Sequence, residues 1–369
     1  MITLISSSGS LFFSPGPKSQ KPLKQRLDCP AGYSQPYEPP TSVHRLRPGD
    51  IRVVGAMGDS LTAGNGAFST LIIDVKRNYR GVSWSGGANG HYLTTFTLPN
   101  VLKHFSHHLV GGSTGSGGPE TPQSQFNVAK AGALHMAMPR QAHALVNRMR
   151  RDPRIDFQND WKMVTLMIGG NNLCSHVCMR KNFWPHSPHG HATFIKEALD
   201  ILHANMPRTF VNLVPVVDVS VLMDVKGKNL PCQIADNVLC PCLFGKKRLG
   251  KRAMRHMVTG YQNAVIQLVE SGRYDTREDF TVVIQPFNVE SKLPMVGSQF
   301  GMRADPTFMS ADCFHLSQRG HSLMAQALWN NMLEPVGHKS WDWRIMGGLR
   351  CPTDSNPFFT TRMNPDGRR

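Results

Sequence analysis

Short apolar runs alternate along the chain with longer stretches in which apolar residues recur at helical spacing. Short apolar runs are typical of strands buried in a parallel sheet, and helical spacing is typical of helices that cover such a sheet. The runs predict buried strands at Ile51–Met57, Phe126–Ala131, Met163–Ile168, Phe210–Val217 and Phe280–Pro286. The helical spacing predicts helices at Met136–Arg150, His191–Met206, Met254–Gly272 and Gln318–Leu333. This alternation predicts an α/β fold, a three-layer α/β/α domain around a central, mostly parallel five-stranded sheet.

The two ends of the chain lack this pattern. Residues 1–42 carry seven prolines among Ser, Lys and Gln, and residues 341–369 are also rich in turn-forming residues. We therefore expect an N-terminal tail or linker over 1–42, one domain over 43–340, and a C-terminal tail over 341–369. No apolar run approaches the roughly 18–20 residues that cross a bilayer. The first residues also make a poor signal peptide, because no basic residue precedes their apolar part.

The charge balance narrows the range of partners. The chain has 41 Lys and Arg against 25 Asp and Glu, a formal charge of +16. Such a charge favours anionic surfaces, namely phospholipid headgroups or nucleic acid. The densest basic cluster, between Lys246 and Arg255, has no interleaved aromatic residues and matches no nucleic-acid module. We expect this cluster to be a solvated loop entering a helix, and we expect no nucleic-acid partner.

The cysteines raise a choice between disulfides and a metal site. The chain has eight cysteines, and Cys174 and Cys178 lie near several histidines: His176, His186, His189 and His191. Their spacing fits no common structural zinc pattern, so disulfides in an extracellular protein explain them better. The pairing stays open, as does the oligomeric state. The absence of any Asn-x-Ser/Thr acceptor counts against secretion. We expect an extracellular or cell-surface protein that needs no metal and no cofactor.

Turns of small residues follow three of the predicted strands, where parallel sheets bind their ligands. They are Gly58-Asp59-Ser60, Ala131-Gly132-Ala133 and Gly169-Gly170-Asn171-Asn172. A serine hydroxyl needs an imidazole to take its proton and an acceptor to orient that imidazole. Asp312 and His315 could supply both from one short turn.

These motifs resemble a known family. The run Gly58-Asp59-Ser60-Leu61, the glycine after the second strand, Gly169-Gly170-Asn171 and Asp312-x-x-His315 are similar, in order and approximate spacing, to the four blocks of the GDSL, or SGNH, ester hydrolases. More narrowly, most of residues 43–337 resembles the catalytic modules of membrane-associated phospholipases B. The resemblance implies a flavodoxin-like SGNH-hydrolase fold and hydrolysis of fatty acyl esters in phospholipids and lysophospholipids.

The resemblance also implies a role for each residue. Ser60 would attack the ester carbonyl, His315 would act as base and then acid, and Asp312 would orient the imidazole. The backbone N–H groups of Ser60 and Gly132 and the side-chain amide of Asn171 would form the oxyanion hole. We expect Asp59 and Asn172 to support these groups without reacting.

Each residue also has a simpler explanation. Ser60 could be a helix cap, Asn171 a turn residue, and Asp312 the cap of the helix near Gln318. His321 is a rival base, but no carboxylate precedes it at the matching spacing.

One position departs from the family. Members usually carry Asp where this chain has Asn172, a change that could weaken the enzyme without abolishing its activity. Two alternatives therefore stay open: an esterase for other lipid or short-chain esters, and a catalytically silent lipid-binding module.

Overall fold

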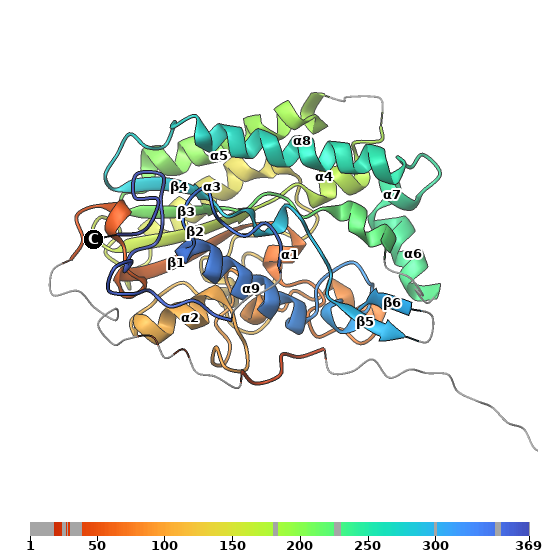
Figure 1. Cartoon of the computed structure of the whole chain (residues 1–369), viewed down its shortest axis with the longest axis horizontal. Coiled ribbons are helices and arrows are strands. Elements are labelled where there is room, and N and C mark those ends of the chain that lie inside the picture. The colour runs from red at the N-terminus through yellow and green to blue at the C-terminus, as the bar shows by residue number, and fades with distance from the viewer. Residues whose placement is uncertain are drawn as a thin grey trace, which may run out of the picture.

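A parallel sheet forms the centre of the molecule. The computed structural model describes residues 18–23, 27, 29, 39–179, 184–224, 230–298, 301–343 and 348–368. Within these residues the main sheet has four parallel strands in the order β1-β2-β3-β4 (Figure 1). The strands are β1 (Ile51–Gly58), β2 (Trp161–Met167), β3 (Thr209–Leu213) and β4 (Phe280–Ile284). Four of the five predicted strands are therefore confirmed.

The fifth predicted strand, Phe126–Ala131, is not a regular strand. Its backbone lies along the free edge of β1, where the N–H of Ala56 donates to the carbonyl of Phe126 (3.0 Å) and the N–H of Val128 donates to the carbonyl of Ala56 (2.9 Å). Val110 pairs with Val53 further back on the same edge, so two short segments share it and neither forms a continuous ladder. Counting this segment as the second strand in chain order gives 2-1-3-4-5, the flavodoxin-like arrangement.

Helices cover both faces of the sheet, and the four predicted helices are present. Figure 1 shows α3 and α5 with α8 on one side, and α2 with α9 on the other. Their bounds are α2 (Leu98–Phe105), α3 (Met138–Arg150), α5 (Pro188–Asn205), α8 (Lys251–Glu270) and α9 (Gln318–Leu333). Alternate strand residues point to opposite faces. Val53 and Val164 therefore pack in the core beneath α3 and α5, whereas Val54 and Met163 pack in the core beneath α2 and α9.

Shorter elements surround this framework. They are α1 (Ser60–Ala63), α4 (Gly170–Ser175), α6 (Leu230–Leu239), α7 (Pro241–Phe244) and a hairpin of β5 (Met295–Ser298) and β6 (Gly301–Ala304). Among the described helices, none combines the length and hydropathy that a membrane span requires.

Disulfides account for all eight cysteines. The pairs are Cys29–Cys351, Cys174–Cys240, Cys178–Cys242 and Cys232–Cys313. Two of them fasten α4 and the turn that follows it to α7 and to the residue before α7. The expectation of disulfides at Cys174 and Cys178 is confirmed, and these two thiols are not available as zinc ligands.

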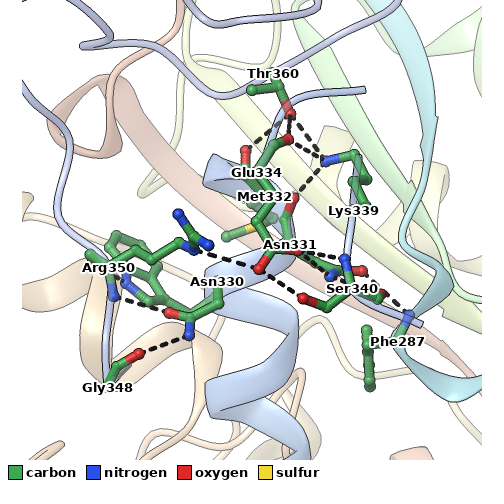
Figure 2. Close-up of polar contacts among 11 residues, drawn as sticks. Phe287, Asn330, Asn331, Met332, Glu334, Lys339, Ser340, Gly348, Arg350 and Thr360 are labelled. Carbon is green, nitrogen blue, oxygen red and sulfur yellow. Dashed lines mark hydrogen bonds and ion pairs between the residues drawn. The ribbon is translucent and has the colours of Figure 1, made fainter. Parts of the chain in front are cut away.

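The C-terminal segment 348–368 lies against the domain body. Phe359 is fully buried there, and Figure 2 shows the polar contacts that hold the neighbouring turn. The Lys339 ammonium donates to the carbonyls of Asn331 and Glu334 at the end of α9 and to the Thr360 hydroxyl (2.9 Å). Burial lowers the pKa of Lys339 to about 7. Lysine here supplies the donors that the last carbonyls of a helix lack.

The described part of the N-terminal segment also contacts the body. The N–H of Leu23 donates to the carbonyl of Leu93 (2.8 Å), and Leu27 is buried in the core beneath α2 and α9. The disulfide between Cys29 and Cys351 joins this segment to the C-terminal segment. Parts of both predicted tails are thus attached to the domain.

Candidate active site

The turn after β1 presents Ser60 at the carboxyl end of the sheet. Gly58 closes the strand with a φ of +155°, and a Cβ at this position would lie 2.5 Å from the carbonyl oxygen of Met167. Only glycine tolerates this conformation and this contact. Asp59 then caps α1, because its Oδ1 accepts the N–H of Leu61 (3.0 Å). Burial raises the pKa of Asp59 to about 6.

A residue that sequence reasoning missed fixes this turn. The side-chain amide of Gln141, on α3, accepts from the Gly58 N–H through Oε1 and donates to the Gly58 carbonyl through Nε2, each at 2.9 Å. The two bonds satisfy both backbone groups of the last strand residue. No local signal marks Gln141, because it lies 83 residues from Gly58 and the contact exists only in the folded state.

Ser60, His315 and Asp312 form one chain of hydrogen bonds. Ser60 Oγ lies 2.9 Å from His315 Nε2, and His315 Nδ1 lies 2.6 Å from Asp312 Oδ2. The other carboxylate oxygen, Oδ1, accepts the backbone N–H groups of Phe314 (3.0 Å) and His315 (2.9 Å). All three members of this chain are buried. Burial alone would raise the pKa of Asp312, but the hydrogen bonds from His315 and the nearby backbone hold it below its usual value.

The loop that carries Asp312 and His315 is fastened at several points. The N–H of Ser310 donates to the carbonyl of His315 (2.8 Å), and Ser310 Oγ donates to the carbonyl of Gly66 (2.7 Å), in the loop that follows Ser60. Cys313 is bonded to Cys232 on α6. These links hold the loop at the turn that bears Ser60.

His321 does not take part in this chain. It is fully buried in α9, and within the described residues neither of its ring nitrogens has a hydrogen-bond partner. Burial lowers its pKa to about 3. A ring without a bond to Ser60 and held neutral is poorly suited to the role of the rival base.

The two remaining oxyanion candidates lie on adjacent loops. Asn171 lines the same pocket as Ser60, and its Nδ2 donates to the carbonyl of Ala133 (2.9 Å). An amide NH₂ has two hydrogens, so this bond leaves one hydrogen for a ligand. Gly132 precedes Ala133 and has a φ of +73° with open space around it. Its backbone conformation, rather than crowding, requires glycine. Gly132 is exposed and is not among the residues that line the pocket.

Asn172 is fully buried beneath these loops. Its Oδ1 accepts the backbone N–H of His135 (3.0 Å), and its Nδ2 lies 3.0 Å from His186 Nδ1 and 3.3 Å from His135 Nε2. Asn172 therefore ties the loop of Asn171 to the turn that carries Gly132. Sequence reasoning missed His135 in this network and named His186 only as a possible zinc ligand.

The histidines around Asn172 favour their neutral forms. Burial lowers the pKa of His135 to about 4. Burial also lowers the pKa of His186, and it holds the pKa of His191 far below its usual value. His135 Nδ1 lies 3.2 Å from His191 Nδ1, so at least one of these two rings is neutral in this arrangement. Within the described residues no group of three or more His, Cys, Asp or Glu is placed to hold a metal ion.

A small pocket opens beside Ser60. Its volume is about 60 Å³, and Ser60, Asp59, Gly170 and Asn171 form its polar side. The rest is mainly apolar and includes Val217, Val219, Leu222, Met309, Phe314 and Leu316. Such a site places a nucleophile, a hydrogen-bonded base and an amide donor at the end of an apolar surface, which is the set of groups that acyl transfer requires.

Comparison with known proteins shows which family the chain belongs to. Residues 54–328 match the family model described as GDSL-like Lipase/Acylhydrolase. The chain belongs to this family. The matched range covers most of the chain, so the predicted GDSL membership is confirmed. The α/β fold expected for a GDSL hydrolase is also confirmed.

Relatives of this GDSL hydrolase include membrane-associated phospholipases. It is 44% identical over 333 residues to "Phospholipase B1, membrane-associated" of Homo sapiens, and 43% identical over 334 residues to that of Rattus norvegicus. Each alignment covers 88% of this chain but only 22% and 23% of the relatives, so the chain spans less than a quarter of their length. A crystal structure of an acetyl esterase mutant with acetate ion matches with a TM-score of 0.38 and 12% identity, over 74% of this chain and 93% of that chain. That likeness is too weak to support a conclusion.

Proposed function

We propose that this GDSL hydrolase removes fatty acyl groups from phospholipids and lysophospholipids through an acyl-Ser60 intermediate. The hydrogen-bond chain from Ser60 to His315 (2.9 Å) and on to Asp312 (2.6 Å) carries this proposal. The similarity to membrane-associated phospholipase B1 supports the choice of phospholipid esters.

The chemistry follows two half-reactions. Ser60 Oγ attacks the ester carbonyl carbon while His315 Nε2 takes its proton, and the resulting imidazolium gives that proton to the departing alcohol. Water then attacks the acyl-Ser60 ester while His315 takes its proton, and the imidazolium returns that proton to Ser60 Oγ as the free fatty acid leaves. Asp312 keeps a proton on His315 Nδ1, so that Nε2 faces Ser60 as the acceptor. The N–H of Ser60, the N–H of Gly132 and Asn171 Nδ2 would stabilise the oxyanion.

A nucleophile replacement tests this proposal. Ser60→Ala should remove hydrolysis of phosphatidylcholine and lysophosphatidylcholine and abolish covalent labelling by a fluorophosphonate probe. Ser271→Ala, which changes an exposed serine at the end of α8, is the matched control and should retain both. Circular dichroism would verify that both variants fold.

The same experiment separates the alternatives. Labelling of the wild-type chain without phospholipid hydrolysis would indicate an esterase for other esters. A wild-type chain that binds lipid but is neither labelled nor active would be a silent lipid-binding module. Retained hydrolysis in Ser60→Ala would overturn the assignment of the nucleophile.

We also propose peripheral contact with an anionic membrane surface, outside the cell or at its surface. On α6, Leu230, Ile234 and Val238 recur every four residues and are 68%, 56% and 70% exposed. The disulfide between Cys232 and Cys313 holds this apolar stripe beside the loop of His315, and the basic cluster follows after α7. An apolar stripe with nearby cations is the pattern of a helix that binds the surface of a bilayer.

Vesicle sedimentation tests this contact. Ile234→Glu should weaken binding to vesicles of phosphatidylcholine with phosphatidylserine, and higher salt should weaken it further. Unchanged binding of this variant would exclude α6 as the contact.

A further inference from the structure

A second and much larger cavity adjoins the pocket of Ser60. Its volume is about 760 Å³, whereas the Ser60 pocket holds about 60 Å³. The two cavities share Asp218, Val221, Leu293 and Trp343 in their linings. We call the larger cavity the hairpin groove, because Met295 of β5 and Ala304 of β6 form part of its wall.

Size separates the roles of the two cavities. The Ser60 pocket, at about 60 Å³, is far smaller than a typical ligand site. The hairpin groove falls within the roughly 300–1,000 Å³ of typical ligand sites. A long hydrocarbon chain attached to an ester at Ser60 therefore extends beyond the small pocket, and the shared lining residues place the groove directly beside that pocket.

The surface of the hairpin groove suits a hydrocarbon. Its apolar lining includes Leu293, Pro294, Met295, Phe308, Leu323 and Trp343. Met295 is 49% exposed, so the groove leaves apolar surface in contact with water. Covering that surface with a lipid chain is favourable by roughly 25 cal/mol for each Å² removed from water.

The charges in the hairpin groove cancel one another. Each basic lining residue has an acidic neighbour that also lines the groove: Lys251 with Asp224 (2.5 Å), Arg255 with Asp218 (3.9 Å) and Lys292 with Glu290 (2.8 Å). Among the described lining residues, no cation is left without an acidic neighbour to attract an anionic ligand. The groove is therefore better matched to a neutral chain than to a free acid group.

We propose that the hairpin groove binds the fatty acyl chain of the ester that Ser60 attacks. This inference rests on the proposed ester hydrolysis and adds the location and chemical class of its acyl site. Acyl chains of eight or more carbons would pass Leu293 and Trp343 and lie along Met295 and Leu323. Each methylene that enters the groove should raise kcat/KM by up to about fourfold.

The test varies the acyl chain while the leaving group stays constant. The substrates are p-nitrophenyl acetate and p-nitrophenyl octanoate, used below the concentration at which they aggregate. In Met295→Glu, the ratio of kcat/KM for octanoate to that for acetate should fall at least about tenfold, because a carboxylate would face the chain. Met363→Glu is the matched control: Met363 is also exposed, lies outside the groove, and should keep the wild-type ratio.

A second variant and a second readout separate the possible failures. Leu323→Trp, which fills the groove sterically, should lower the same ratio. Binding of a fluorescent fatty acid to the Ser60→Ala protein should weaken when Met295→Glu is added, and this measurement needs no catalysis. If no ester is hydrolysed but binding still depends on Met295, the proposed function fails and the acyl site stands.

Two other results would overturn the acyl site itself. One is an unchanged ratio and unchanged binding in both groove variants while the wild-type chain hydrolyses esters. The other is a loss confined to octyl acetate, in which the long chain belongs to the alcohol, because the groove would then hold the leaving group.

Discussion

The candidate site has two sides that differ in charge. The acid–base side consists of Asp312 and His315, and the oxyanion side consists of Asn171 with the supporting Asn172. On the acid–base side, the pKa of Asp312 is lowered and its carboxylate lies 2.6 Å from His315, so this side carries a negative charge. On the oxyanion side, Asn172 lies among His135, His186 and His191, whose pKa values are all lowered by burial. One side holds a carboxylate against the His315 ring, and the other surrounds Asn172 with rings that favour their neutral forms.

This difference teaches why an asparagine suits position 172. Its amide can accept from the N–H of His135 and donate to a neutral imidazole at the same time. A carboxylate there could accept but not donate, and it would favour protonated histidines. The departure from the family's usual Asp therefore fits a local environment of neutral rings.

The largest expected effect is on the charged side. Asp312→Asn should lower kcat by about 10³- to 10⁴-fold, because an amide can hold His315 in the wrong tautomer and cannot balance its charge. Steady-state kinetics on p-nitrophenyl butyrate would measure it, with Asp366→Asn on the surface as the control. A loss of less than tenfold would show that the charge on Asp312 is not needed.

The next effect is on the oxyanion side. Asn171→Ala should lower kcat by about 10²- to 10³-fold with a much smaller change in KM, because the donated hydrogen bond strengthens as the oxyanion forms. Asn205→Ala, at the exposed end of α5, is the control. If KM rose and kcat did not change, Asn171 would bind the ground state instead.

A smaller effect on kcat is expected when a negative charge is introduced on the oxyanion side. Asn172→Asp should lower kcat less than Asn171→Ala does, because residue 172 supports the loops without touching the ester.

The pH dependence of stability tests directly whether the Asn172→Asp variant changes the charge of the neighbouring histidines. In the wild type, the folded state disfavours protonated histidines, while unfolded histidines take up protons below about pH 6.5. Stability should therefore fall as the pH decreases from about 6.5 to 4, the value to which the pKa of His135 is lowered. A carboxylate at 172 would favour the protonated rings and flatten this slope in denaturant titrations. An unchanged slope would show that these rings do not sense residue 172.

The smallest effect on catalysis is expected far from both sides. Lys339→Met, in the turn after α9, should leave kcat/KM within about twofold of wild type. Because the folded pKa of Lys339 is about 7 and the unfolded value is near 10.4, this group makes stability rise between about pH 7 and 10. The variant should lose that rise in thermal melts. A large loss of activity would instead show that this turn is coupled to the site.

The sequence predicted the regular part of the fold because burial alone dictates it. Strands β1 to β4 are buried along almost their whole length, and α9 spans Gln318–Leu333 as its periodicity indicated. The prediction of a strand at Phe126–Ala131 was wrong, because this segment makes a single bridge with β1, between Asn127 and Ala56. The N–H of Gly58, which would continue the ladder, donates to Gln141 instead. Helix α6 escaped detection, since much of its apolar face is exposed rather than turned to a core.

Site residues divide in the same way. Ser60, Asp312 and His315 lie in short sequence motifs, so the sequence alone was enough to propose them as candidates. Gln141 and His135 act through contacts with residues 83 and 37 positions away, respectively. No local pattern encodes such contacts, and a single sequence contains no signal that would reveal them.

The distance along the chain between Ser60 and His315 has a consequence for biosynthesis. The two residues are 255 positions apart, so a ribosome adding about 5–20 residues per second delivers the serine roughly 10 to 50 s before its base. The nascent chain therefore carries Ser60 without its proposed base until the loop of His315 has been synthesised. The bond between Cys29 and Cys351, 322 positions apart, can close only later still. Hydrolytic activity should thus first arise on a domain whose chain is almost fully synthesised.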